Sequence, residues 1–544
     1  MSVAGTMLPG SVEQLVYTFV FDPKGLGPDN GFAAALRRLH ELERSRGRSG
    51  RPCWVWRPAR FHPSELLPHV AAYLDAGVDH KGAALAADCG ERSFDPASFD
   101  RLTAARWRLN RDSLASALVG SQMGEGQHDE GRPRGRQPLE LRLHVGGRVR
   151  DNAVVGARLE IPFELVSVDL VLFRVGVGFL VFKVRPKASD AATWFDFRHY
   201  ARFFGGQRSV RVTGGDAPPF VFADVCTRLL DALAPEGAAT GGPWRSNMFM
   251  EDQAVLYSSW FVALDATSDD AERHRRDLRY RFREYFNAGQ RLHQDASQDA
   301  PHRDDVAVYL RDQWFTFGLE GGGFLALDPP DEPFFRENLP QHVSEVYFVA
   351  FLLALHQRLA LLRLSTEVSE HWLRGSEKER LRSFQRIREQ YLAFKARGYY
   401  SQVMQRNHHH AVYCRWQESL QVPLLFDEVR DEVREMHAYL ADEAQRRIRV
   451  QLEEVQLQNV ELEQRIELIG FLLGGFVLGV GLVQVLGAHL GAWPWWSVVL
   501  LVITLGLAST ALLAWIAGLP AIGALRERLG RKQTVGREGG SGDR

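Results

Sequence analysis

Residues 448–486 read IRVQLEEVQLQNVELEQRIELIGFLLGGFVLGVGLVQVL and combine two patterns in one continuous stretch. In the first half, one residue in every three or four falls on a common line: Ile448, Leu452, Val455, Asn459, Leu462, Ile466 and Ile469. This alternating spacing is that of a coiled-coil seam. No charge follows Glu467 in the second half, and about 20 apolar residues suffice to cross a bilayer core as a helix. The stretch predicts one helix that self-associates and then enters a membrane as a first span, residues 466–486.

A second uncharged stretch, WWSVVLLVITLGLASTALLAWIAGL, occupies residues 495–519. The segment GAHLGAWP between the two stretches is long enough only for a tight turn, so the pair is predicted to form a helical membrane hairpin. The turn has no Lys or Arg, whereas basic residues precede the first span and follow the second. The positive-inside rule therefore puts both ends in the cytoplasm. We see no signal peptide before residue 30 and expect a multi-pass protein of the inner or plasma membrane.

Composition narrows the class of protein further. Residues 1–465 precede the first span and suffice for a sizeable core. The net charge is −1 and no basic stripe with interleaved aromatics occurs, so nucleic acid is not an expected partner. Four cysteines lie far apart without a CxxC pair, which argues against a zinc cluster and fits a reducing compartment.

Residues 11–335 are predicted to form one α/β or α+β cytoplasmic domain with a sensor-like character. Strand patterns occur at 14–22, near 53, several times within 139–185, and at 252–264, 314–319 and 323–327. Helical patterns occur at 31–44, 220–233 and 269–286, and 63–118 is expected to be mostly helical. Residues 121–138 have no apolar periodicity and are expected to form an exposed linker. Gly321 to Gly323 lack the Lys-Ser/Thr of a phosphate loop and are interpreted as a hairpin turn.

Residues 344–465 are predicted to form a helical stalk that leads into the hairpin. The segment 346–365 has an apolar run of about ten residues, too short to cross a bilayer, so a buried helix is the better interpretation. A charged helix is expected at 377–397, a third helix from near Ser401, and a break at Pro423 before the long seam helix. Residues 520–544 form a basic tail that is expected to be cytoplasmic.

The angular positions of residues around the axis of the seam helix indicate a candidate pore lining. At about 100° per residue, five residues return to nearly one line: Asn459, Ile466, Gly470, Val477 and Gln484. One interpretation is a pore lined by this row, with a polar residue at each mouth. The other is that Asn459 sets the register of the seam and Gln484 is an interfacial residue. Glycines at 470, 474, 475, 479 and 481 include two GxxxG spacings, which favour close contact either around an axis or between the two spans.

The order of elements resembles that of the CorA family of divalent-cation channels. An α/β cytoplasmic domain is followed by helices, one long helix enters the first of two C-terminal spans, and a basic tail follows; the match is clearest over residues 344–532. The resemblance implies a pentameric funnel whose pore is lined by the first span. It also implies a basic ring at the inner mouth, formed by Arg526, Arg528, Arg531 and Lys532. The family's Gly-Met-Asn signature is absent, because residues 485–496 read VLGAHLGAWPWW. The resemblance therefore does not imply Mg²⁺ selectivity.

Acidic residues on the stalk are candidate regulatory ligands for Mg²⁺ or another divalent cation. Asp427, Asp431 and Glu435 repeat every fourth residue, and hard cations prefer such oxygen ligands. The alternative, which we favour, is a solvated face balanced by nearby arginines. His408, His409 and His410 are consecutive and point about 100° apart on a helix, so they are not expected to chelate one ion. No catalytic motif is evident, no cofactor is firmly implied, and an enzyme is not expected.

Three functions are compatible with these patterns. The first is a CorA-like homo-oligomeric channel for divalent metal cations, gated by the cytoplasmic domain. The second is a ligand-gated membrane effector of the defence type, in which a small nucleotide-like cytoplasmic ligand opens the pore. The aromatic and basic stretch 194–208 is a candidate pocket for such a ligand, or else core packing with exposed arginines. The third is a non-conducting membrane scaffold. The expected partners are further copies of the chain, the lipid bilayer and, in the second case, the ligand.

Overall fold

The computed structural model divides the chain into two compact units, Met1–Met436 and His437–Arg544. The residues that it describes are 5–21, 31–44, 56–59, 61, 65–74, 102–109, 118, 139–150, 153–203, 210–214, 218–231, 233, 244–245, 253–264, 271–285, 287–289, 305–373, 377–487 and 494–516. The predicted linker 121–138 and the basic tail from 520 lie outside these residues. The boundary between the units falls inside the predicted stalk.

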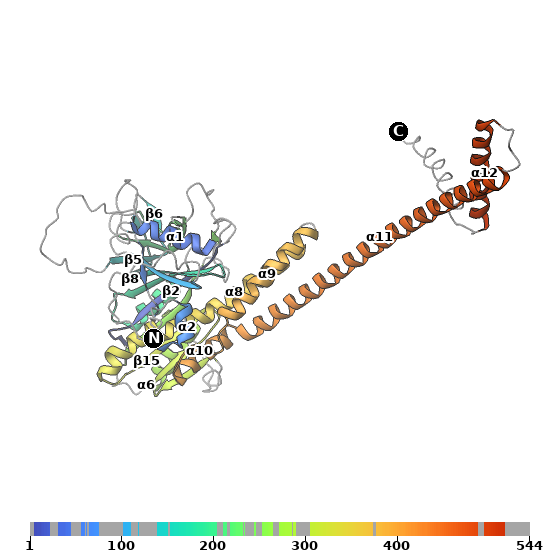
Figure 1. Cartoon of the computed structure of the whole chain (residues 1–544). Helices are drawn as coiled ribbons and strands as arrows, with labels where there is room; N and C mark the ends of the chain where they lie inside the picture. Colours follow the sequence, from blue (N-terminus) through green and yellow to red (C-terminus); the bar gives the residue numbers. More distant parts are fainter. Residues whose placement is uncertain are drawn as a thin grey trace, which may run out of the picture. The chain divides into compact units, whose positions relative to one another are not determined.

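The first unit is built on a mixed sheet (Figure 1). Its path is β10-β5-β8-β9-β2-β12-β15-β14-β13, and β1, β3, β4 and β11 pair at its sides. The strands are β1 (Thr6–Met7), β2 (Val12–Phe21), β3 (Trp56–Ala59), β4 (Ala104–Leu109), β5 (Leu139–Val145), β8 (Leu159–Phe173), β9 (Val177–Pro186), β10 (Val210–Thr213), β11 (Trp244–Arg245), β12 (Val255–Ala263), β13 (Val306–Leu310), β14 (Gln313–Thr316) and β15 (Gly321–Leu327). A separate ribbon pairs β6 (Arg148–Arg150) with β7 (Ala153–Val155). Pairing is antiparallel except between β12 and β15.

Helices cover both faces of this sheet. One face packs against α1 (Gly31–Arg44), α4 (Ala191–Ala201), α5 (Phe222–Asp231) and α6 (Ala271–Glu284), whose apolar residues share clusters with alternate strand residues. Residues on the opposite face, such as Tyr257, contact the later helices: its ring lies 5.2 Å from that of Phe348, and its hydroxyl donates to the Val343 carbonyl at 2.9 Å. Both faces of the sheet are therefore buried, as the near-continuous apolar sequence of β12 requires.

The later helices of the first unit start with a long element that is largely buried from Leu339 to Leu364. It comprises two π-helical turns (Phe334–Asn338 and Val343–Tyr347), α7 (Leu339–His342) and α8 (Phe348–Leu373). It is followed by α9 (Glu377–Arg397), α10 (Asn407–Ser419) and α11 (Val422–Gly487). Earlier in the chain there is also a short helix, α2 (Pro68–Tyr73). The residues of α11 up to Met436 belong to this unit and bury a stripe formed by Val422, Val429, Val433 and Met436. The spacing of these four residues along the sequence is that of one helix face.

Sequence periodicity predicted most of these elements. The helices 31–44 and 377–397 have the predicted bounds, and the strand predicted at 14–22 is present as β2. The expectation that 63–118 is mostly helical is wrong for its described part, because β4 occupies 104–109 and α2 has only six residues. The segment AARWRL is a strand because it pairs with both β3 and β8. The helix expected from near Ser401 begins later, at Asn407.

The interpretation of Gly321 to Gly323 as a hairpin turn is also wrong. These glycines open β15 and pair in parallel with β12, Gly321 opposite Leu256 and Gly323 opposite Ser258. A Cβ atom on Gly321 would lie 1.9 Å from the Leu256 carbonyl oxygen, and one on Gly323 would lie 1.9 Å from that of Ser258. Both also have positive φ angles, 125° and 149°, which favour glycine. The glycine run therefore serves close strand pairing.

One buried ion cluster ties the sheet to the helical layer. The Asp169 carboxylate on β8 accepts hydrogen bonds from Arg106 (Nε, 3.1 Å) and Arg108 (Nε, 2.6 Å) on β4. Arg106 also lies 3.8 Å from Glu345, which pairs with Lys183 at 3.0 Å. Burial alone raises the pKa of Asp169, but the two arginine charges outweigh it and hold that pKa well below its usual range. Asp169 is thus ionised at neutral pH and fully paired.

The second unit contains the rest of α11 and the helix α12 (Trp495–Ile516). Its described residues cover the end of the predicted stalk and the two stretches predicted as spans, except for residues 488–493 and those after Ile516. α11 runs without interruption through the seam and the first span, as the sequence predicted.

Candidate functional site

Two helices of the described chain are long and apolar enough to cross a membrane. They are Phe334–Glu370 and Val422–Gly481, and a shorter apolar segment, Trp495–Ser509, lies in α12. The apolar window of the first is 83% buried within the protein, so it is a core helix, as predicted for residues 346–365. The window of the second is only 11% buried. The candidate site is therefore the apolar part of α11 together with α12.

The predicted seam presents an uncovered apolar surface in the single chain. Its aliphatic residues are all more than half exposed, from 51% for Val455 to 66% for Ile466. Asn459 is exposed among them. Water in contact with a row of Leu, Ile and Val costs free energy, about 25 cal/mol for each Å² of apolar surface. A row of this length is a candidate contact surface for a partner or for lipid.

The two apolar helices pack on one another through small residues. The Ser509 hydroxyl of α12 donates to the Gly475 carbonyl of α11 at 2.9 Å. A Cβ atom on Gly479 would lie 3.1 Å from the Cα atom of Gly506. Gly475, Gly479 and Gly506 are buried. One of the two GxxxG spacings, Gly475 and Gly479, therefore serves contact within the hairpin.

The second GxxxG pair faces away from α12. A Cβ atom on Gly470 or Gly474 would meet nothing within 4 Å. At about 100° per residue, Gly475 and Gly479 lie roughly 160° from Asn459 on either side of the helix. The predicted pore line and the α12 contact thus occupy opposite faces of α11.

The structure places the five predicted pore-lining residues on the exposed part of α11. Asn459, Ile466, Gly470, Val477 and Gln484 are all exposed in the single chain, and Val477 is 67% exposed. Their assignment to a pore stays a prediction, since only copies of the chain around an axis would bring them together. The residues predicted for the basic ring, Arg526, Arg528, Arg531 and Lys532, lie outside the described residues.

The candidate regulatory carboxylates are exposed, and Asp427 and Asp431 pair with arginines of their own helix. Arg430 contacts Asp427 at 2.6 Å and Asp431 at 3.2 Å, and Arg434 contacts Asp431 at 3.4 Å. Within the described part of the chain, no group of three or more His, Cys, Asp or Glu side chains could hold a metal ion. A divalent-cation site at Asp427, Asp431 and Glu435 would need carboxylates from a second subunit, and it stays a prediction.

The three consecutive histidines at the start of α10 face different neighbours. The His408 ring is 6.5 Å from that of Tyr309, the His409 ring packs at 4.7 Å on Tyr347, and His410 Nε2 lies 3.5 Å from Cys414 Sγ. Burial lowers the pKa of His409 to about 3, so this ring is neutral at physiological pH. The three rings are structural contacts of α10.

The described part of the stretch 194–208 is core. Trp194 and Phe195 pack at 5.8 and 4.7 Å on the Trp260 ring. Arg198 is buried and not exposed, and its guanidinium donates to the Phe282 carbonyl at 2.6 Å while it lies over the Phe282 ring. Trp194, Phe195 and Arg198 therefore serve core packing, and residues 204–208 lie outside the described part of the chain.

Comparison of the chain with protein-family models, curated proteins and solved structures found no match.

Replacing Gly479 by leucine is expected to disrupt the hairpin. The new side chain would have to enter the contact with Gly506, and overpacking of this kind costs about 1–3 kcal/mol. The apparent melting temperature of the detergent-purified protein should fall. Gly474→Leu is the matched control, because that position has open space around it in the chain. Equal melting temperatures for the two variants would contradict the assigned contact face.

Proposed function

We propose that the chain is the subunit of a CorA-like homo-oligomeric channel that conducts divalent metal cations across a membrane. The observation that carries the proposal is the position of the α12 contact on α11. Between Ile448 and Gly470 the helix is exposed on all sides, and further on, Val477, on the line through Asn459, lies roughly opposite Gly475 and Gly479, which contact α12. A helix with this arrangement favours an assembly in which α11 faces a shared axis and α12 lies outside.

The resemblance to CorA channels suggests five subunits, with Mg²⁺ or another divalent cation as the transported ion. Both termini would be cytoplasmic, and Arg526, Arg528, Arg531 and Lys532 would surround the inner mouth. In this proposal Asn459 and Gln484 supply polar oxygens at the two ends of the apolar row. The protein would act in transport and not as an enzyme.

A ligand-gated effector is the second candidate. The large first unit is packed onto the beginning of α11: Tyr399 stacks on Phe426 at 4.1 Å, and Ser365 donates to Glu432 at 3.0 Å. A change in the first unit would therefore reach the helix that is proposed to line the pore. Flux that appears only with an added cytoplasmic ligand would support this candidate over constitutive transport.

The proposal is tested by reconstitution of the purified full chain into vesicles that contain a Mg²⁺-sensitive dye. We expect Mg²⁺ or Co²⁺ entry above that of empty vesicles, and we expect Asn459→Leu to change its rate because a polar group at the mouth is removed. An assembly that shows no flux with either ion, with or without an applied membrane potential, would favour a scaffold. Unchanged flux in the Asn459→Leu variant would show that Asn459 does not line the pore.

A further inference from the structure

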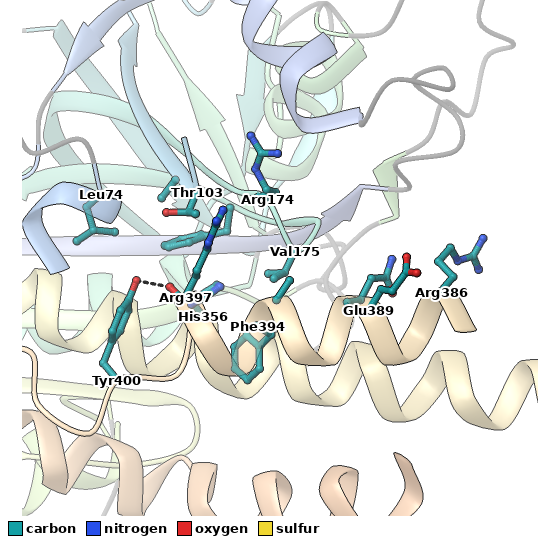
Figure 2. Close-up of a pocket in the computed structure, with 15 residues that line it drawn as sticks. Leu74, Thr103, Arg174, Val175, His356, Arg386, Glu389, Phe394, Arg397 and Tyr400 are labelled. Atoms are coloured by element: carbon teal, nitrogen blue, oxygen red, sulfur yellow. Dashed lines mark hydrogen bonds between the residues drawn. The ribbon is translucent and has the colours of Figure 1, made fainter. Parts of the chain in front are cut away.

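The cavity in Figure 2 is bounded by side chains that already have partners. It has a volume of about 300 Å³ and lies between the end of β8 and the helices α8 and α9. Arg174 Nε donates to the Leu102 carbonyl at 2.7 Å, and its guanidinium lies over the Phe32 ring. His356 stacks on Phe173 at 3.9 Å between ring centroids, and each is only 3% exposed. These side chains serve the packing of the sheet on the helices, whereas extensive exposed apolar surface is found on α11.

A second apolar row runs along α11 on the side away from the seam. It is formed by Val450, Leu457, Val460 and Leu468, which are 61%, 68%, 50% and 50% exposed in the single chain. At about 100° per residue, all four lie within about 60° of Leu457 around the helix axis, whereas Asn459 of the seam lies about 160° away. We call these four residues the outer stripe. An oligomer formed through the seam would leave the outer stripe uncovered.

The outer stripe continues the face of α11 that contacts α12. The step from Leu457 to Gly475 is about five full helical turns, so the two residues have the same angular position. The Gly475 carbonyl accepts a hydrogen bond from the Ser509 hydroxyl of α12 at 2.9 Å. Gly479, about 40° further around the helix, approaches Gly506 of α12. The outer stripe is therefore the extension, toward the stalk, of a contact face that α12 already uses.

Acidic residues flank the outer stripe. Glu453 lies about 40° to one side of Leu457 and Glu454 about 60° to the other, and both are exposed. Arg465 is the only Lys or Arg within residues 450–468, and it lies about 80° from Leu457. An anionic lipid surface, or the same stripe of a second copy, would bring like charges together. The chemistry of the stripe fits a partner that is apolar on one face and basic beside it.

The sequence after α12 has this character. Residues 520–530 read PAIGALRERLG and lie outside the described residues. Ile522, Leu525 and Leu529 are spaced three and four apart, as on one face of a helix. A Pro at the start and a Gly at the end of such a pattern are typical of helix boundaries. The sequence therefore predicts a short amphipathic helix with arginines beside its apolar row.

We propose that residues 520–532 dock on the outer stripe of their own chain. The apolar row of this segment would cover Leu457 and Val460, while Arg526 and Arg528 lie beside the flanking glutamates. Apolar burial supplies the contact, and the opposite charges set its orientation.

The length of chain after α12 allows this contact. α12 is described to Ile516, about two turns or 10 Å beyond Ser509, which contacts Gly475. Residues 517–519 span at most about 10 Å more. The segment therefore starts within about 20 Å of Gly475, and Leu457 lies about 27 Å from Gly475 along α11. A helix of residues 520–530, about 16 Å long, covers the remaining distance.

This contact lies within one chain, so it requires neither an oligomer nor ion conduction. It would fix the end of α12 to the cytoplasmic part of α11. In the proposed channel it would also place the basic residues of the tail on the outside of the bundle of α11 helices, beside the inner mouth. Only this last consequence rests on the proposed function.

Disulfide formation tests the contact in the full chain, with its four native cysteines replaced by serine. Val460→Cys is combined with Leu525→Cys, and Leu457→Cys with Leu529→Cys. A disulfide forms only where the two Cα atoms come within about 7 Å. We expect both pairs to link within one chain, measured by mass spectrometry of the digested protein, at least about tenfold faster than a control pair that shares only the tether.

The control pair is Leu462→Cys with Leu525→Cys. Leu462 is 54% exposed on the same helix, but it lies about 140° around the axis from Leu457. Equal rates of linking within the chain for the stripe and control pairs would overturn the proposal. Stripe pairs that link only between chains, seen as dimers on a denaturing gel, would assign the stripe to a second copy and overturn it too. Stripe thiols that do not link, and are shielded from a water-soluble maleimide only in vesicles, would show that lipid covers the stripe.

Charge reversal separates docking by this segment from a loss of folding. Glu453→Arg with Glu454→Arg should slow the linking of Val460→Cys to Leu525→Cys by about three- to tenfold, as expected for exposed ion pairs. Arg526→Glu with Arg528→Glu should have the same effect. All four reversals together should restore the rate to within about twofold, because opposite charges again face one another. A combined variant that links no faster than either double variant would contradict the proposed pairing.

Discussion

The double substitution Leu452→Asp and Leu462→Asp is expected to convert the assembly into single subunits in detergent. Both leucines lie on the predicted seam, and in the single chain their side chains are 55% and 54% exposed. An oligomer would bury them against copies of themselves, and a carboxylate at each position would then be brought close to equivalent carboxylates without a cation. Removing an unpaired charge from water costs several kcal/mol for each ion, which exceeds what one seam contact provides.

The measurement is the mass of the purified protein by native mass spectrometry or by light scattering after gel filtration. Val450→Asp with Leu457→Asp is the matched control. These residues are 61% and 68% exposed on the same helix, but they occupy the position opposite the seam in the heptad. The control should keep the mass of the wild type. A seam variant with the wild-type mass, or a control that dissociates equally, would show that another surface holds the subunits together.

The second large effect is expected at Val477, in the middle of the proposed pore line. In a chain whose four native cysteines are replaced by serine, Val477→Cys should react with a positively charged, membrane-impermeant methanethiosulfonate reagent. The reaction would fix a cation in the path of the transported ion. Repulsion of like charges in a narrow site of low dielectric is strong, so flux should fall at least about tenfold, which corresponds to roughly 1.4 kcal/mol.

Leu478→Cys is the control for this experiment. Leu478 is also exposed in the single chain, at 52%, but it lies about 100° around the helix from Val477. In the proposed assembly it faces a neighbouring helix or lipid, where the reagent has no aqueous route. Its reaction should be much slower and should leave flux unchanged. Equal reaction at the two positions, or full flux after modification at 477, would show that the row of residues containing Val477 does not line the pore.

The residues of the α11–α12 contact show how far sequence reasoning extends. GxxxG spacing indicated that glycines of the first span make close contacts, but it did not tell which pair serves the hairpin. The structure assigns Gly475 and Gly479 to α12 and leaves Gly470 and Gly474 uncovered within the chain. The stretch 194–208 seemed suited to a ligand, but Trp194, Phe195 and Arg198 of its described part lie in the core.

The sequence by itself determined the features that depend on neighbours along the chain. Helices 31–44 and 377–397 and the continuous seam helix follow from periodicity, since i, i+3 and i+4 positions share one helix face. The two apolar stretches of the hairpin follow from their uninterrupted length. Tertiary structure alone decided the strand at 104–109 and the parallel pairing of Gly321 and Gly323 with β12. Each of these depends on contacts between residues far apart in sequence, and spacing within a segment carries no information about which distant segment will pack against it.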